Sequence, residues 1–219
     1  MPSPRKLTRG LAALVLAASL AACAGQQTTR TGFLDPAGPA LAADREGALT
    51  FTAAPAVLAR YEAVFIEPVV FRAGPATPAA PDPAVERDLA EAYRTTLAEA
   101  FAARHYRVLD ALPAAPVRTL RVRAAITGHE RANVALNLAT TLLLAPVTAG
   151  GAASEAEVVD AATGERLVAL ATHSNGTPFL GGPHNYFRQH GHARAALARH
   201  ARDLAERLPR RPMNWADRS

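Results

Sequence analysis

The segment 156–172 reads Ala-Glu-Val-Val-Asp-Ala-Ala-Thr-Gly-Glu-Arg-Leu-Val-Ala-Leu-Ala-Thr and carries the pattern of a β-hairpin. Residues 156–159 and 166–172 are rich in residues that favour strands, and residues 160–164 join them. Gly164 can adopt a positive φ angle at no steric cost, which hairpin loops of this length require. The segment therefore predicts two antiparallel strands.

Four further stretches predict strands. Residues 61–71 are rich in β-branched and aromatic residues. Pro68 cannot donate a backbone hydrogen bond, so the strand is expected to bend there or to run along an edge. Residues 120–126 alternate apolar and polar side chains, which predicts one buried face and one wet face carrying Arg121 and Arg123, matched by nearby acids. Residues 49–52 and 106–109 predict two short strands.

Two amphipathic helices are predicted. Asp82 and Pro83 are suited to open a helix that ends near Arg104. A second helix is expected from about Tyr186 until Pro209 stops it. Both have apolar residues on a single stripe, namely Val85, Leu89, Tyr93, Leu97 and Phe101 in the first and Leu197, Ala201, Leu204 and Leu208 in the second. The expected fold is α+β, a two-layer sandwich with a mixed, mostly antiparallel sheet of about five strands and two amphipathic helices on one face.

The N-terminus has the pattern of a bacterial lipoprotein signal. Basic residues at positions 5, 6 and 9 precede an uncharged apolar run, residues 11–20, and two alanines. This run is too short for a spanning helix, which needs about 20 apolar residues. Cys23, the single cysteine of the chain, follows directly. Leu20-Ala21-Ala22-Cys23 looks like a lipobox, in which the thiol is acylated and the peptide is cut before the cysteine.

These patterns divide the chain into four parts. Residues 1–22 form the signal peptide, 23–46 a lipidated tether, 47–209 a single α+β domain and 210–219 a C-terminal tail. Within the tether, Phe33 and Leu34 are expected to dock on the domain, since a free apolar tether would be a liability. Ala24, rather than aspartate, favours sorting to the outer membrane.

Composition excludes several functions. The 24 basic residues include three in the signal and the 19 acidic residues none, so the mature chain is near +2. That charge gives no basis for nucleic-acid binding. Lys6 is the only lysine, which excludes a P-loop lysine or a Schiff base in the mature chain. With Cys23 acylated, no free thiol remains for catalysis or metal binding.

Few residues offer site chemistry. His184, His190 and His192 cluster in one loop-to-helix segment and are the candidates for a metal site, although no carboxylate or fourth ligand is in reach by sequence. Solvated or capping histidines are the competing interpretation. Ser174 lacks the first glycine of a nucleophile elbow, and Ser154 and Ser219 are the other serines of the mature chain. We expect no enzymatic activity and no cofactor.

Residues 132–154 carry no charge and are strongly apolar. Leu136, Leu138, Leu142 and Leu143 are the candidate surface for a partner. The segment is either a buried connection or an exposed patch that meets a partner protein, another copy or the bilayer.

The chain resembles a known family in the order and spacing of several motifs. They are the lipobox, Thr31-Gly32-Phe33-Leu34, Tyr61-Glu62-Ala63-Val64 running into Ile66-Glu67-Pro68-Val69, the hairpin at residues 160–165 and a C-terminal helix. This arrangement is similar to the bacterial lipoproteins of domain-of-unknown-function family 3313. The resemblance implies an envelope location and brings no activity and no catalytic residue.

The expected function is that of a lipid-anchored outer-membrane protein facing the periplasm. A non-enzymatic adaptor or assembly protein fits the tether, the lack of reactive residues and the uncharged segment. Its expected partners are the membrane, through the lipid, and an envelope protein or another copy of the chain, and no nucleic acid. The alternative is a periplasm-facing lipoprotein that binds a small ligand or metal through the histidine-rich segment.

Overall fold

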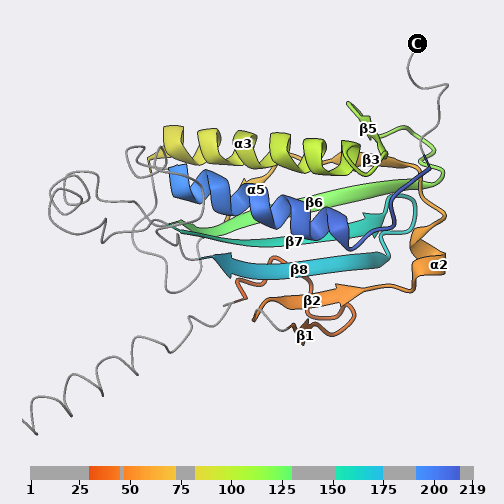
Figure 1. Ribbon diagram of the computed structural model, residues 1–219, viewed down its shortest axis with the longest axis horizontal. Helices are drawn as coiled ribbons and strands as arrows, with labels where there is room; N and C mark the ends of the chain where they lie inside the picture. Colours follow the sequence, from red (N-terminus) through yellow and green to blue (C-terminus); the bar gives the residue numbers. More distant parts are fainter. Residues whose placement is uncertain (1–29, 45–46, 73–81, 130–150, 175–190, 213–219) are drawn as a thin grey trace, which may run out of the picture.

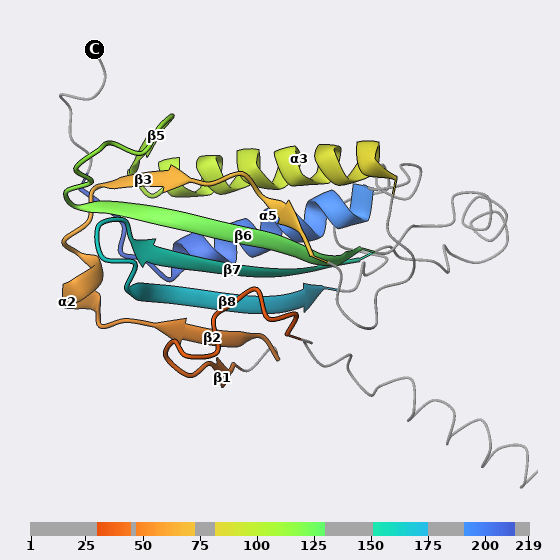
Figure 2. The same ribbon diagram turned by 180° about the vertical axis from the view of Figure 1, so that it is seen from behind.

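A computed structural model describes residues 30–44, 47–72, 82–129, 151–174 and 191–212. One sheet is covered on one face by two long helices (Figure 1), and the N-terminal segment crosses the other face (Figure 2). The α+β sandwich with both helices on one face is therefore confirmed. Within the described residues, no helix is both long and apolar enough to cross a bilayer.

The sheet contains eight strands. Seven follow the order β1-β2-β8-β7-β6-β3-β5, and β4 pairs with β6 beyond the end of β3. The strands are β1 (Ala42–Ala43), β2 (Leu49–Thr52), β3 (Ala63–Ile66), β4 (Val70–Phe71), β5 (Arg107–Leu109), β6 (Thr119–His129), β7 (Ala152–Asp160) and β8 (Arg166–Ser174).

The expected sheet of about five mostly antiparallel strands is wrong in number and in balance. The pairs β3–β5, β3–β6 and β4–β6 are parallel, whereas the other four are antiparallel. Pro68 accounts for one additional strand, because it has no N–H and divides the predicted 61–71 strand into β3 and β4. The two-residue β1 adds another, at the edge formed by the end of the tether.

The predicted hairpin is confirmed and forms the centre of the sheet. β7 and β8 pair along nearly their whole length, from Ala152 opposite Ser174 to Val159 opposite Arg166. Gly164 in the connecting loop has a φ angle of 76° and donates its N–H to the Asp160 carbonyl at 2.9 Å. A side chain at this position would be strained, which explains the glycine.

Three helices are described: α2 (Pro55–Leu58), α3 (Pro83–Ala102) and α5 (Gly191–Glu206). Asp82 caps α3, since its Oδ1 accepts a hydrogen bond from the Ala84 N–H at 2.8 Å. The short α2 has no counterpart among the sequence predictions. The start expected for the last helix, near Tyr186, lies outside the described residues.

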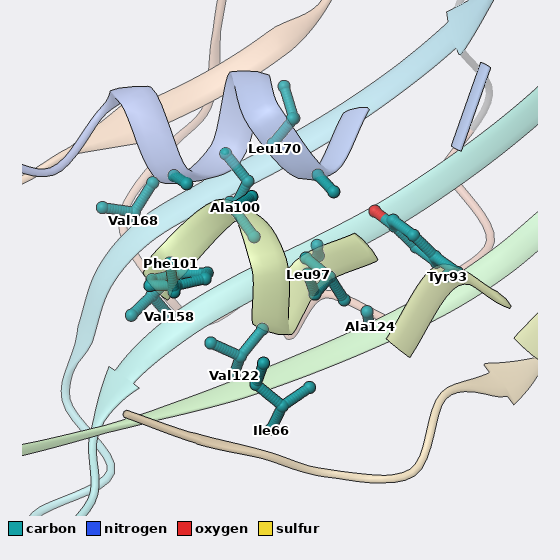
Figure 3. Close-up of a cluster of buried hydrophobic side chains, with 14 of the residues drawn as sticks. Ile66, Tyr93, Leu97, Ala100, Phe101, Val122, Ala124, Val158, Val168 and Leu170 are labelled. Carbon is teal, nitrogen blue, oxygen red and sulfur yellow. The ribbon is translucent and has the colours of Figure 1, made fainter. Parts of the chain in front are cut away.

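The core lies between the helices and the sheet. Leu89, Tyr93, Leu97 and Phe101 of the predicted α3 stripe are fully buried. Figure 3 shows them packed over strand residues that include Val122 and Val158. Burying one such side chain contributes about 1.5–3 kcal/mol, so this stripe fixes α3 to the sheet.

Candidate functional site

The face of the sheet opposite the helices holds the end of the tether. We call residues 30–34 the N-terminal clasp. The carboxylate of Glu155 on β7 is buried and accepts hydrogen bonds from the backbone N–H groups of Thr31 and Leu34, the latter at 3.2 Å. Gly32, with a φ angle of 79°, lets the chain turn so that both amides meet one carboxylate.

Apolar and aromatic contacts complete the clasp. Leu34 is fully buried against Ala169 and Ala171 of β8, with Leu49 and Phe51 of β2 nearby. The guanidinium of Arg123 lies 5.7 Å from the centre of the Phe33 ring, a cation–π contact. The prediction that Phe33 and Leu34 dock on the domain is therefore confirmed.

Beside the clasp lies a charged cluster centred on Glu157 of β7. Its carboxylate accepts hydrogen bonds from Arg123 Nη1 at 2.7 Å and from Arg166 Nε at 2.8 Å. The side chains of Glu157 and Arg166 are 3% and 5% exposed, so this ion pair is removed from water. Glu67 extends the cluster, with its carboxylate 3.5 Å from Arg121 Nε. The arginine-lined face is thus matched by acids, as the sequence predicts.

Gly38 closes this region over the Arg166 guanidinium. A Cβ atom at residue 38 would lie only 2.1 Å from Arg166 Nη1. Only glycine lets the chain pass so close, so the segment after the clasp shields the buried charge from water.

The hairpin is tied to β3 through Asp160. Its Oδ2 accepts a hydrogen bond from the Tyr61 hydroxyl at 2.7 Å, and its Oδ1 accepts from the N–H groups of Ala162 and Thr163. Burial raises the pKa of Asp160, but these hydrogen bonds outweigh it and hold the pKa below its ordinary value. The motifs at residues 31–34, 61–64 and 160–165 therefore all meet β7.

A buried polar chain crosses the other face of the sheet. The Tyr93 hydroxyl donates to Ser154 Oγ at 3.3 Å, and Ser154 Oγ lies 2.9 Å from His200 Nδ1. The second ring nitrogen, Nε2, lies 2.8 Å from Ser174 Oγ. His200 is 1% exposed. Burial, helped by Arg199 and His173, lowers its pKa to about 3, so the ring is neutral at pH 7.

The hydrogen bonds of this chain have a direction. Because Tyr93 donates to Ser154, the Ser154 hydroxyl is left to donate to His200 Nδ1. A neutral ring that accepts at Nδ1 carries its proton on Nε2 and donates it to Ser174 Oγ. In this tautomer His200 cannot take a proton from Ser174. The pair therefore lacks the polarity of a serine nucleophile and its base.

The histidine prediction is answered for one residue. His192 is 3% exposed in the first turn of α5, and burial lowers its pKa. His184 and His190 lie outside the described residues. Within the part of the chain that the structure describes, no three His, Cys, Asp or Glu side chains are grouped so that they could hold a metal ion. Cys23, Leu136, Leu138, Leu142 and Leu143 also lie outside it.

Sequence reasoning missed Glu155, Glu157 and His200. The two glutamates alternate with Ser154, Ala156 and Val158, a pattern that places them on one strand face and is typical of a wet face. His200 falls on the apolar stripe of α5, three residues after Leu197 and four before Leu204. That spacing was the available signal for a buried histidine.

Comparison with known structures finds similar folds at low identity. The PelC dodecamer from Paraburkholderia phytofirmans matches at 10% identity with a TM-score of 0.48, covering 74% of this chain and 98% of that one. A DUF4136 family protein from Bacteroides thetaiotaomicron matches at 10% identity with a TM-score of 0.42, covering 77% and 100%. A comparison with curated proteins gives no match.

The family itself is defined by sequence. Residues 29–204 match the family model described as a protein of unknown function, DUF3313. That range begins two residues before Thr31 and includes every element from the N-terminal clasp into α5. The chain therefore belongs to the DUF3313 family.

Proposed function

We propose that this protein is a lipid-anchored protein of the bacterial cell envelope. In this proposal it acts as a non-enzymatic adaptor on the periplasmic side of the outer membrane, and acylated Cys23 is its attachment point. The observation that carries the proposal is the N-terminal clasp. The residues that directly follow the proposed tether are fixed to the centre of the sheet by the buried carboxylate of Glu155.

The clasp makes the tether short. Seven residues separate Cys23 from Thr31. Such a stretch spans at most about 30 Å when fully extended. An acyl group on Cys23 would therefore hold the clasp-bearing face of the domain close to the bilayer. Two or more acyl chains suffice for firm anchoring without a spanning helix.

The polar chain of the helix-covered face supports a non-enzymatic role. His200 donates to Ser174 instead of accepting from it, and Ser154, rather than a carboxylate, lies at its Nδ1. A serine nucleophile needs a base with the opposite polarity. Tyr93, Ser154, His200 and Ser174 are better explained as a chain that ties α3 and α5 to β7 and β8.

The proposed partner surface is the uncharged segment 132–154, with Leu136, Leu138, Leu142 and Leu143 as its centre. Its flanking strand ends are described: His129 at the end of β6 is paired with Ala152 at the start of β7. Ala152 is three residues before Glu155, which binds the clasp. The segment thus joins the domain close to the point where the tether does.

Cys23→Ser tests the anchor. We expect this variant to remain an unprocessed or water-soluble form, whereas the wild type partitions into the detergent phase, because serine offers no thiol for acylation. Phase partitioning and mass spectrometry of the N-terminal peptide measure the effect. Thr28→Ser, a change of similar size outside the proposed cleavage site, serves as the control. A Cys23→Ser protein that partitions like the wild type would refute the anchor.

Leu143→Asp tests the partner surface. A charge there should reduce co-purification of cross-linked envelope partners by about tenfold or more, the effect of one unpaired charge in an apolar contact. The thermal unfolding midpoint should change little. Ala114→Asp, at an exposed position in the loop before β6, is the matched control. Unchanged partners in the Leu143→Asp sample would contradict the adaptor function.

A further inference from the structure

One edge of the sheet carries an open groove that no site described above uses. Its floor is formed by residues 65–69 of β3 and the following turn, and its other wall by the exposed side of α3. Figures 1 and 2 show β3, β5 and α3 together at this edge. The groove has a volume of about 580 Å³ and is lined by Phe65, Ile66, Pro68, Val69, Arg87, Ala90, Glu91, Arg94 and Asp110.

The exposed large apolar side chains of the described residues also gather at this edge. Val70 on β4 is 44% exposed and Val108 on β5 is 36% exposed. Val117, which is 77% exposed, lies in the loop that leads from β5 to β6. Apolar side chains grouped beside a groove indicate a contact surface, whereas scattered ones would need no explanation.

Two opposite charges at the groove lack an ion-pair partner within the described residues. Arg87 donates only to the carbonyl of Pro83 in its own helix, at 3.3 Å. Asp110 makes neither a hydrogen bond nor an ion pair with any other described residue. Arg94, in contrast, lies 3.8 Å from Glu91. Arg87 and Asp110 are therefore available to an incoming molecule.

The two charges stand at opposite ends of the groove. β3 and β5 are parallel, so the connecting helix α3 runs antiparallel to both. Asp110 directly follows Leu109, which is level with Phe65 of β3. Arg87 is the fifth residue of α3, at the end of the helix near β4. The groove is thus acidic at the β5 end and basic at the β4 end.

We propose that this groove is the contact surface for a second copy of the same chain, related by a two-fold axis. Such an axis turns the second groove end for end. Arg87 of each copy then faces Asp110 of the other, and the exposed valines of the two edges come together. An isologous contact requires this self-complementary distribution of charge.

The composition of the edge favours a second copy over an added strand or a small molecule. Pro68 lies in the middle of the edge and cannot donate to an incoming strand. A small ligand would leave the valines outside the groove uncovered, whereas another copy of the edge covers them. The proposal concerns the folded domain and does not depend on the lipid anchor.

Co-expression of two tagged copies of the full chain tests the contact. Wild-type copies should co-purify. Recovery should fall about tenfold when both copies carry Arg87→Asp or both carry Asp110→Arg, because each pairing then sets like charges against each other twice. Recovery should return when one copy carries Arg87→Asp and the other Asp110→Arg, since both contacts are again between opposite charges.

The mixed pair separates the proposal from loss of folding and from shared detergent micelles. Aspartate near the N-terminus of α3 is compatible with the helix dipole, so Arg87→Asp should fold. Arg202→Asp, at an exposed position of α5, is the control and should co-purify like the wild type. The proposal is overturned if wild-type copies do not co-purify, if they co-purify whatever the charges, or if the mixed pair recovers no better than the matched ones.

Discussion

Replacing Glu157 with alanine is expected to lower the free energy of unfolding by about 3–5 kcal/mol. Glu157 and Arg166 form an ion pair whose side chains are 3% and 5% exposed. Removing the carboxylate leaves the Arg166 guanidinium without an opposite charge in a place that water does not reach. Gly38 packs directly on that guanidinium, so the arginine cannot move out without displacing the segment that follows the clasp. Urea unfolding followed by circular dichroism measures the change.

Two further variants separate burial from charge in this cluster. Arg123→Ala removes the other partner of Glu157, but the Arg123 side chain is 41% exposed. Its loss should therefore cost about 1 kcal/mol or less. Glu157→Leu combined with Arg166→Leu removes both buried charges and should recover much of the lost stability. A loss below about 1 kcal/mol for Glu157→Ala would show that the pair does not carry the weight given to it.

The second large effect is expected in acid. The free energy of unfolding should fall by about 1.4 kcal/mol for each pH unit between about 6.5 and 3. Burial lowers the pKa of His200 to about 3 in the folded protein, from an ordinary value of 6.5. Between these two values the unfolded chain binds a proton at this position and the folded protein does not. Acid therefore favours the unfolded state until the pH reaches the folded pKa.

Other groups contribute to the same curve, so a variant isolates His200. Asp160, with its pKa held below the ordinary value, also loses its stabilising hydrogen bonds as the pH falls. His200→Gln removes the imidazole and keeps a side chain that can donate and accept. Its stability should be less dependent on pH than that of the wild type by the amount attributed to His200. Urea unfolding at several pH values measures both proteins, and equal slopes would contradict the role given to His200.

Local patterns in the sequence were enough for the hairpin and for α3. Gly164 and the strand-forming residues on both sides of it indicate β7 and β8 directly, and the four-residue spacing from Leu89 to Phe101 fixes the buried side of α3. The pairing of β3 with both β5 and β6 could not be predicted in the same way. It is set by contacts between segments far apart in the chain, which periodicity does not encode.

The candidate site shows the same limit. Glu155 and Glu157 have the spacing of a wet strand face, and they are buried because the clasp covers them. Leu34 and Glu155 are separated by 121 residues in the sequence. A local pattern gives the face on which a residue lies but not what is packed on that face. The docking of Phe33 and Leu34 was predictable from their apolar character, whereas the carboxylate that receives them was not.

The position of the clasp determines how the domain would bear mechanical load. Glu155 lies on β7, which has β8 on one side and β6 on the other, in the middle of the sheet. In a protein anchored through Cys23, a pull from the membrane would act on this interior strand. Its hydrogen bonds to both neighbours would then share the force along their whole length, whereas an edge strand could be peeled away one bond at a time. The clasp thus directs tension into the part of the fold best able to resist it.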